Sequence, residues 1–218
     1  EAGKSAGSSL GKTLISTATK ALAAAGIGKA ISASITEGAA LEQSIGGIET
    51  LFKDSADSVK AYATKAYKTA GLSANAYMET ATSFAASLLQ GLGGDTEKAA
   101  KITDMAITDM SDNANKMGTD MSSIQNAYQG FAKQNYTMLD NLKLGYGGTK
   151  SEMERLLKDA QKITGVKYDL DNLSDVYEAI HVIQGELDIT GTTAKEAATT
   201  LSGSLASVKS AFTNVLGN

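Results

Sequence analysis

Apolar residues recur every three or four positions along most of the chain, which is the spacing of a buried helical face. The pattern is clearest in the middle of the sequence, at Ile102, Ala106, Met110, Ala114 and Met117 and then at Met121, Ile124, Tyr128 and Phe131. Such spacing is typical of helix bundles and coiled coils. We therefore expect an all-α protein with several short to medium helices, arranged as a helical bundle or as an elongated coiled-coil-like assembly.

Polar caps and glycine stops indicate where the earlier helices begin and end. Helices are predicted over residues 39–52, 55–70 and 73–92. Ser55 and Ser73 are placed to accept hydrogen bonds from the first free amides of two of them, and Gly71 is placed to end one in a left-handed conformation. Gly118 and Asp120 form a similar stop and cap between the two halves of the central pattern.

The C-terminal part carries its own helix signals. Thr149 and Glu152 form a capping box, and Gly165 is the matching stop. The apolar faces expected to be buried are Met153, Leu156, Ala160 and Ile163 in this helix, and Val176, Ile180 and Ile183 in a helix over residues 174–185. A second capping box, Thr193 to Glu196, predicts the last helix, and the only competing strand pattern is a weak one over residues 166–170.

Glycines also suggest how the chain is divided. Gly145, Gly147 and Gly148 lie in one short run, GYGG, which we interpret as a hinge. We predict a segment rich in small residues over 1–38, a helical core region over 39–146 and a C-terminal helical region over 147–218. Proline is absent from all 218 residues, which suits a chain that is mostly helix.

Composition excludes several kinds of chemistry. With no cysteine there is no disulfide, no thiolate metal site and no cysteine nucleophile. A net charge of -4 argues against the basic footprint that nucleic-acid binding requires, so no specific nucleic acid is expected as a partner. The acidic residues Asp104, Asp109, Asp112 and Asp120 lack the spacing of a calcium loop and are interpreted as a solvated helix face.

The remaining candidates for chemistry are weak. Gly11, Lys12 and Thr13 end a near match to a phosphate-binding loop, but no buried strand precedes them. His181 is the only histidine and is interpreted as a structural or surface residue. A pair such as Glu152 and Glu178 could in principle serve glycoside hydrolysis, but nothing in the sequence selects it. We predict no catalytic, cofactor or metal site and a protein that is not an enzyme.

Methionine points to an interaction surface instead. Six of the seven methionines lie within residues 103–157, and methionine side chains adapt readily to different packing partners. The residues predicted to mediate self-association into a homo-oligomer are Met110, Met117, Met121, Tyr128, Phe131 and Met138. The alternative is that this stripe is an ordinary core within one chain.

The N-terminal segment offers a second class of function. Residues 14–35 are the nearest approach to a membrane span, but Lys20 and Lys29 make insertion costly. The small-residue segment 3–35 could instead belong to a membrane-active, pore-forming or channel-forming module.

Several runs of sequence resemble phage and prophage tail tape measure proteins in their core region. They are LEQSIGGIETLF at 41–52, TAGLSANAYMET at 69–80, ITDMSDNANKMGTDMSSIQNAYQGFAKQNYTMLDNLKLGYGGTKSEMERLL at 107–157 and ITGTTAKEAATTLSGSL at 189–205. The resemblance covers the chain from about Leu41 to its end.

The resemblance implies a mainly helical protein in the lumen of a phage tail. Such a protein helps to set tail length during assembly and leaves the tube ahead of the DNA on infection. The implied partners are tail tube and tail tip proteins, with possible transient contact with the host membrane, and the implied locations are the virion and, during assembly, the host cytoplasm. A cell-wall hydrolase is a further alternative. Fully helical, 218 residues would span only about 330 Å, so we expect a portion of a tape measure rather than the whole ruler.

Overall fold

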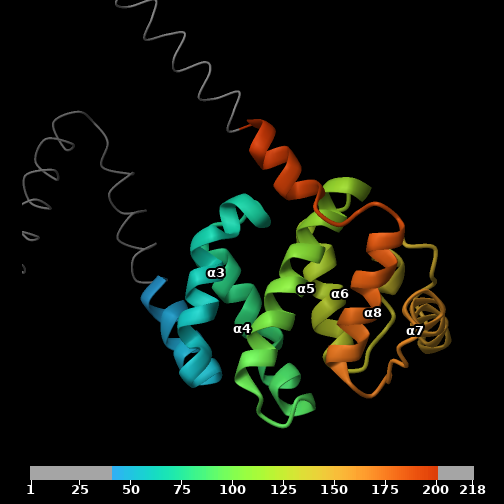
Figure 1. Cartoon of the computed structure of the whole chain (residues 1–218), viewed down its shortest axis with the longest axis horizontal. Coiled ribbons are helices and arrows are strands. Elements are labelled where there is room, and N and C mark those ends of the chain that lie inside the picture. Colours follow the sequence, from blue (N-terminus) through green and yellow to red (C-terminus); the bar gives the residue numbers. More distant parts are fainter. Residues whose placement is uncertain (1–40, 201–218) are drawn as a thin grey trace, which may run out of the picture. The chain divides into compact units, whose positions relative to one another are not determined.

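The computed structural model describes residues 41–200, which are helical apart from the turns and loops between helices (Figure 1). This part of the chain contains no β-strand, so the prediction of an all-α protein is confirmed. The elements in chain order are a helix over residues 41–52, the 3-10 helix η1 (Lys53–Ser55), α3 (Ala56–Thr69), α4 (Ala74–Gly91), α5 (Thr96–Met117), α6 (Met121–Phe131), the 3-10 helix η2 (Leu139–Leu142), α7 (Lys150–Thr164), α8 (Leu173–Glu186) and a helical stretch over 192–200.

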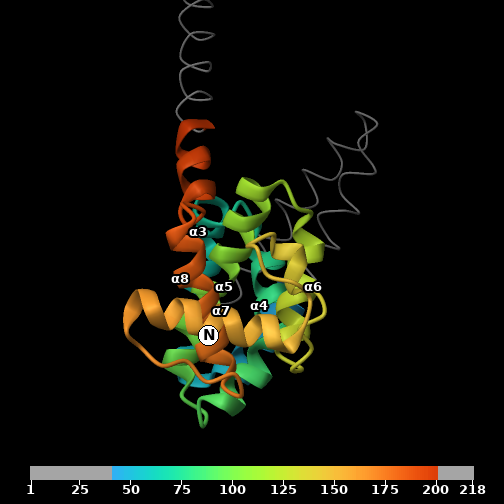
Figure 2. The ribbon, with the colours of Figure 1, turned by 90° about the vertical axis from the view of Figure 1, so that its right-hand side faces the viewer.

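The helices pack as a bundle around α5. Short turns join α3 to α4, α4 to α5 and α5 to α6, so consecutive helices run antiparallel. Helix α5 packs against α3, α4, α6 and α8 as well as both 3-10 helices. Helix α7 packs chiefly on α8 and crosses the direction of the others: it is seen end-on in Figure 1 and along its length in Figure 2.

The core combines aromatic rings with closely packed alanines. The ring of Tyr177 lies 5.5 Å from that of Phe84 and 5.0 Å from that of Tyr128, measured between centroids, and its hydroxyl donates to the Tyr128 carbonyl at 2.9 Å. Elsewhere the buried positions include many alanines, such as Ala63 and Ala66 on α3. Alanine buries little area, so these helix contacts are close but individually weak.

Most of the predicted helix caps are present. Ser73 accepts from the Ala76 amide at the start of α4, and Asp120 accepts from the Ser123 amide at the start of α6. Gly118 and Gly165 end α5 and α7 with φ of 63° and 74°, the left-handed conformation that glycine adopts without steric cost. Helices therefore begin or end at these residues as the sequence predicts.

Ser55 does not have the role that the sequence suggested, and the helix predicted from residue 174 begins one residue earlier. Ser55 makes no side-chain capping hydrogen bond at the start of α3 and instead lies 2.9 Å from the Thr96 hydroxyl. Helix α8 begins at Leu173, and its cap is the side chain of Asn172, which accepts from the Ser174 amide. The predicted boundaries are nevertheless within one residue of the observed ones.

Two finer predictions are wrong. Residues 166–170, which carry the weak strand pattern that competed with the helical interpretation, form a loop and turn. Ile163 is 48% exposed, because the buried stripe of α7 consists of Met153, Leu156, Leu157 and Ala160 and so ends before the last turn. The final helical stretch begins at residue 192 and not at a capping box, because the Thr193 amide donates to Asp112.

The described residues from Ser44 onward belong to one compact unit. The predicted boundary between 39–146 and 147–218 falls inside this unit. The predicted segment 1–38 and the part of the last predicted helix beyond residue 200 lie outside the described residues.

Candidate functional site

The six residues predicted for self-association do not share one surface. Met110, Tyr128 and Phe131 are 0%, 0% and 2% exposed and belong to the core. The remaining three, Met117, Met121 and Met138, are partly or largely exposed. The alternative of an intrachain core therefore describes half of the stripe, and self-association stays a prediction for the other half.

Met117 and Met121 lie close together because they flank one turn. Met117 is the last residue of α5 and Met121 the first of α6, with the left-handed Gly118 between them. Both side chains are partly buried against the core. The turn is tied to the rest of the bundle by Lys143, whose Nζ donates to the Met117 carbonyl at 3.2 Å.

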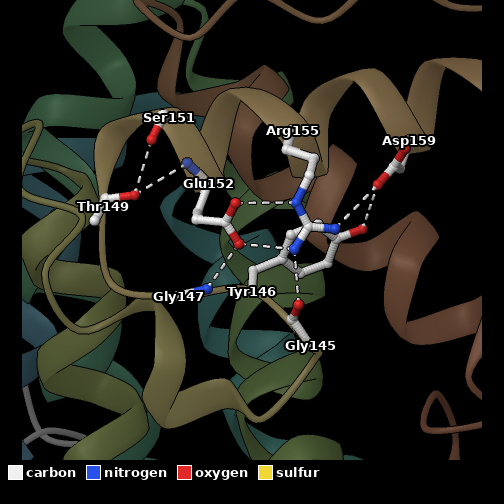
Figure 3. Close-up of polar contacts among 8 residues, drawn as sticks. All are labelled: Gly145, Tyr146, Gly147, Thr149, Ser151, Glu152, Arg155 and Asp159. Carbon is white, nitrogen blue, oxygen red and sulfur yellow. Dashed lines mark hydrogen bonds and ion pairs between the residues drawn. The ribbon is translucent and has the colours of Figure 1, made fainter.

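The GYGG run is held in place by the first turns of α7 (Figure 3). One carboxylate oxygen of Glu152 accepts from the Gly147 amide at 3.0 Å, and the same carboxylate receives Arg155. Arg155 also donates to the Gly145 carbonyl at 2.8 Å, and its guanidinium lies 4.2 Å above the Tyr146 ring. The Thr149 hydroxyl accepts from the Glu152 amide, which is one of the two bonds of the predicted capping box. The second bond is missing, because the Glu152 carboxylate accepts from the Gly147 amide and not from the Thr149 amide.

The charges of this network reinforce one another. The hydrogen bond from Arg155 and the bond from the Gly147 amide lower the pKa of Glu152 to about 2. Burial, together with the hydrogen bond to Asp159, raises the pKa of Tyr146 to about 12. Over the physiological pH range Glu152 and Arg155 are therefore ionised and Tyr146 is neutral, and the loop is held in one charge state.

Gly148 is confined by packing as well. A Cβ built at this residue would lie 2.2 Å from the carbonyl oxygen of Thr137, so only glycine fits. A Cβ at Gly147 would meet nothing closer than Glu152 Cγ at 3.6 Å. The described conformation of the predicted hinge, Gly145, Gly147 and Gly148, is thus a tightly specified loop, and movement about it stays a prediction.

The buried polar face of α5 was missed by the sequence interpretation. Asp109 and Asp112 were expected on a solvated face, yet they are 1% and 0% exposed. Their burial follows from the central place of α5, which has neighbours on almost every side. The only sign of this burial in the sequence is the position of Asp109, which stands three residues after Ala106 and so falls on the apolar stripe.

Each buried acid has a partner distant in sequence. Asp109 on α5 is paired with His181 on α8, so this histidine contacts the interior of the bundle. Asp112 accepts from the Gly191 amide at 2.6 Å and from the Thr193 amide at 2.8 Å. The side-chain amide of the neighbouring Asn113 donates to the Leu142 carbonyl at 2.9 Å. Helix α5 thereby fixes the positions of η2, α8 and the start of the 192–200 stretch.

Glu152 and Glu178 do not form the carboxylate pair of a glycoside hydrolase. Glycoside hydrolysis requires an acid with a raised pKa, whereas the pKa of Glu152 is lowered to about 2 and Glu178 accepts from the Ser174 hydroxyl on its own helix. Within residues 41–200 no cluster of three or more His, Asp or Glu side chains could hold a metal ion.

None of the described helices has the length and apolar character needed to cross a bilayer. A comparison of the chain with protein-family models, curated proteins and solved structures found no match.

Proposed function

We propose that this chain is a non-enzymatic structural region of a phage or prophage tail tape measure protein. In this role it takes part in tail assembly and length determination, and in the passage of DNA and protein through the tail on infection. The observation that carries the proposal is the resemblance of four runs of sequence, of which the longest covers residues 107–157. The proposed partners are further copies of the chain and the tail tube and tail tip proteins, and the proposed location is the tail lumen.

The bundle suits a compact part of such a protein better than its length-measuring part. A ruler needs long uninterrupted helices, but the longest helix in residues 41–200, α5, has 22 residues and spans about 33 Å. Stops at Gly118 and Gly165 interrupt the helical pattern. We therefore assign residues 41–200 to a folded region that anchors or ends the tape measure.

The weak helix contacts suit release through a tube. Alanine contributes many of the buried positions on α3, α4 and α5, and small side chains stabilise each contact only modestly. Helices held in this way can separate one after another, as local unfolding requires. Hydrogen exchange that showed one highly stable and fully cooperative block would contradict this part of the proposal.

The first experiment is to locate the chain in tails. Mass spectrometry of purified tails of the phage that encodes the chain should detect peptides from residues 41–200 in intact tails and find them depleted after DNA release. Absence of these peptides from intact tails would overturn the proposal.

A second experiment separates the ruler from the anchor. Deleting the 15 residues of α7 from a ruler would shorten the tail by about 22 Å. Deletion from a folded anchoring region should stop assembly or leave tail length unchanged. A proportional shortening, measured by electron microscopy, would show that this region measures length.

The membrane-active alternative rests on residues 3–35, which lie outside the described part of the chain. Liposome leakage that requires this segment would favour it. A zymogram of the full chain tests the cell-wall hydrolase alternative, for which clearing of peptidoglycan would be the supporting result.

A further inference from the structure

A cleft of about 280 Å³ opens where the C-terminal ends of α4 and α6 meet the start of α8. Its apolar lining consists of Phe131 and Leu173, which are buried, and of Ala132 and Leu170, which are partly exposed. Its rim carries polar side chains from three separate segments, namely Ser87, Gln90, Gln134 and Asp171. The volume suits a small organic molecule better than a bare ion.

The polar groups of the rim are not used by the fold. The side chains of Ser87, Gln90 and Gln134 make no hydrogen bond within the described part of the chain, and neither does the carboxylate of Asp171. Gln134 also has a φ of 56°, an unusual conformation for a residue other than glycine or asparagine. Strained backbone of this kind occurs often at binding sites.

The charge of the cleft is negative. Gly91 is the last residue of α4, and Phe131 and Ala132 are the last residue and the cap of α6, so two helix C-termini line the cleft and each contributes roughly half a negative charge. The N-terminus of α8 at Leu173 carries a positive partial charge that offsets the charge of about one of these C-termini. Asp171 adds a full negative charge, and no lysine or arginine is among the lining residues.

We propose that this cleft binds a small organic cation through a primary ammonium group. An ammonium group has three donors and no acceptor, which matches the Asp171 carboxylate and the side-chain oxygens of Gln90 and Gln134. The partly exposed side chains of Ala132 and Leu170 then contact the methylene chain that carries the ammonium. Phosphates and carboxylates are repelled, and one carboxylate is too few for a calcium site. The proposal does not depend on the tape measure function.

The test uses the full chain labelled with ¹⁵N and two ligands of equal length. Saturable shifts of the amide signals of Gln90, Gly91 and Gln134 are expected on titration with 1,5-diaminopentane. No comparable shifts are expected with 1,5-pentanediol, which has hydroxyls in place of the ammonium groups. Equal binding of the diol would overturn the proposal, because the cleft would then recognise neutral groups.

Two variants with the same change of charge locate the binding. Asp171→Asn should weaken diamine binding about tenfold, the effect of losing one charge-assisted hydrogen bond. Asp54→Asn removes an exposed carboxylate on η1, which does not line the cleft, and should leave the affinity unchanged. Equal weakening by both variants, or shifts spread over all acidic surfaces, would show that the diamine responds only to net charge.

Discussion

His181 Nδ1 lies 2.8 Å from Oδ1 and 3.0 Å from Oδ2 of Asp109, so the single histidine of the chain is paired with a carboxylate that is 1% exposed. Burial raises the pKa of Asp109 to about 6, even though the bond to His181 acts in the opposite direction. The same bond raises the pKa of His181. Asp112 and Glu178 are further acidic groups close enough to act on the histidine.

This pair predicts stability that falls as the pH rises. Both pKa values are raised in the folded state, so the folded chain binds more protons than the unfolded chain, and linkage then lowers the free energy of unfolding with increasing pH. For His181 the stabilisation is complete below about pH 6.5 and is lost as pH rises through its higher folded pKa. For Asp109, ionisation of the buried carboxyl group lowers the free energy of unfolding as the pH rises from about 4 to 6.

The variant His181→Gln should flatten this dependence, because glutamine can still donate to Asp109 but does not titrate. Between pH 6 and 8 the free energy of unfolding should fall less in the variant than in wild type. The two changes should differ by on the order of 1 kcal/mol or less, since 40% of the His181 side chain is exposed and solvent screens the pair. Urea unfolding at several pH values measures this difference. A pH profile identical to that of wild type would contradict the assignment.

Gly148 and Gly147 form a matched pair for the predicted hinge. Gly148→Ala should destabilise the fold by about 3 kcal/mol, because its Cβ would lie 2.2 Å from the Thr137 carbonyl oxygen. Gly147→Ala should change stability by less than about 1 kcal/mol, since the nearest atom is the flexible Glu152 Cγ at 3.6 Å. Thermal unfolding compares them, and equal effects would show that the loop rearranges easily.

Arg155→Lys should loosen the same loop without unfolding the bundle. Lysine keeps the charge but loses the planar fork that reaches both Glu152 and the Gly145 carbonyl. The expected result is faster hydrogen exchange at the Gly147 amide, with exchange in α5 unchanged. Unaltered exchange at Gly147 would show that Glu152 holds the loop alone (Figure 3).

The methionine stripe can be divided by substitution. Met110→Ala should destabilise the isolated chain by about 3 kcal/mol, because the side chain is fully buried. The double variant Met117→Gln, Met121→Gln should fold and yet fail to support tail assembly if these residues contact another copy. Circular dichroism and electron microscopy give the two readouts. Normal tails from the double variant would remove the proposed interface.

Asp112→Asn should weaken the attachment of the 192–200 stretch. The carboxylate accepts from two backbone amides, those of Gly191 and Thr193, and the asparagine side chain can accept only one such bond while directing an N–H group at the other amide. The free energy of unfolding should fall by about 2 to 3 kcal/mol, and hydrogen exchange at both amides should become faster. Asp54→Asn, on the exposed surface of η1, is the control and should have no effect.

The sequence was informative wherever a local rule applied. Ser73, Thr149 and Gly165 have the capping roles predicted for them, since a cap depends only on residues within one helical turn. The predictions failed where a distant partner decided the outcome. Thr193 belongs to no capping box because Asp112, 81 residues earlier, accepts from its amide.

The candidate site was predictable in its glycines and not in its buried acids. The GYGG run and the Thr149 to Glu152 signal are adjacent in sequence, so their association needed little tertiary information. Asp109 and Asp112 looked like surface residues because charged side chains are seldom buried. Their burial becomes apparent only when α3, α4, α6 and α8 are seen around α5.

The contacts of α5 also determine when the bundle can be completed during synthesis. The ribosome makes Asp112 some 81 residues before Thr193, an interval of about 4 to 16 s at ordinary rates of translation. His181 is made 72 residues after Asp109, so for most of that time both carboxylates of the central helix lack their C-terminal partners, and a buried charge without a partner is strongly unfavourable. The nascent chain must therefore keep α5 solvated until its C-terminal partners have been made.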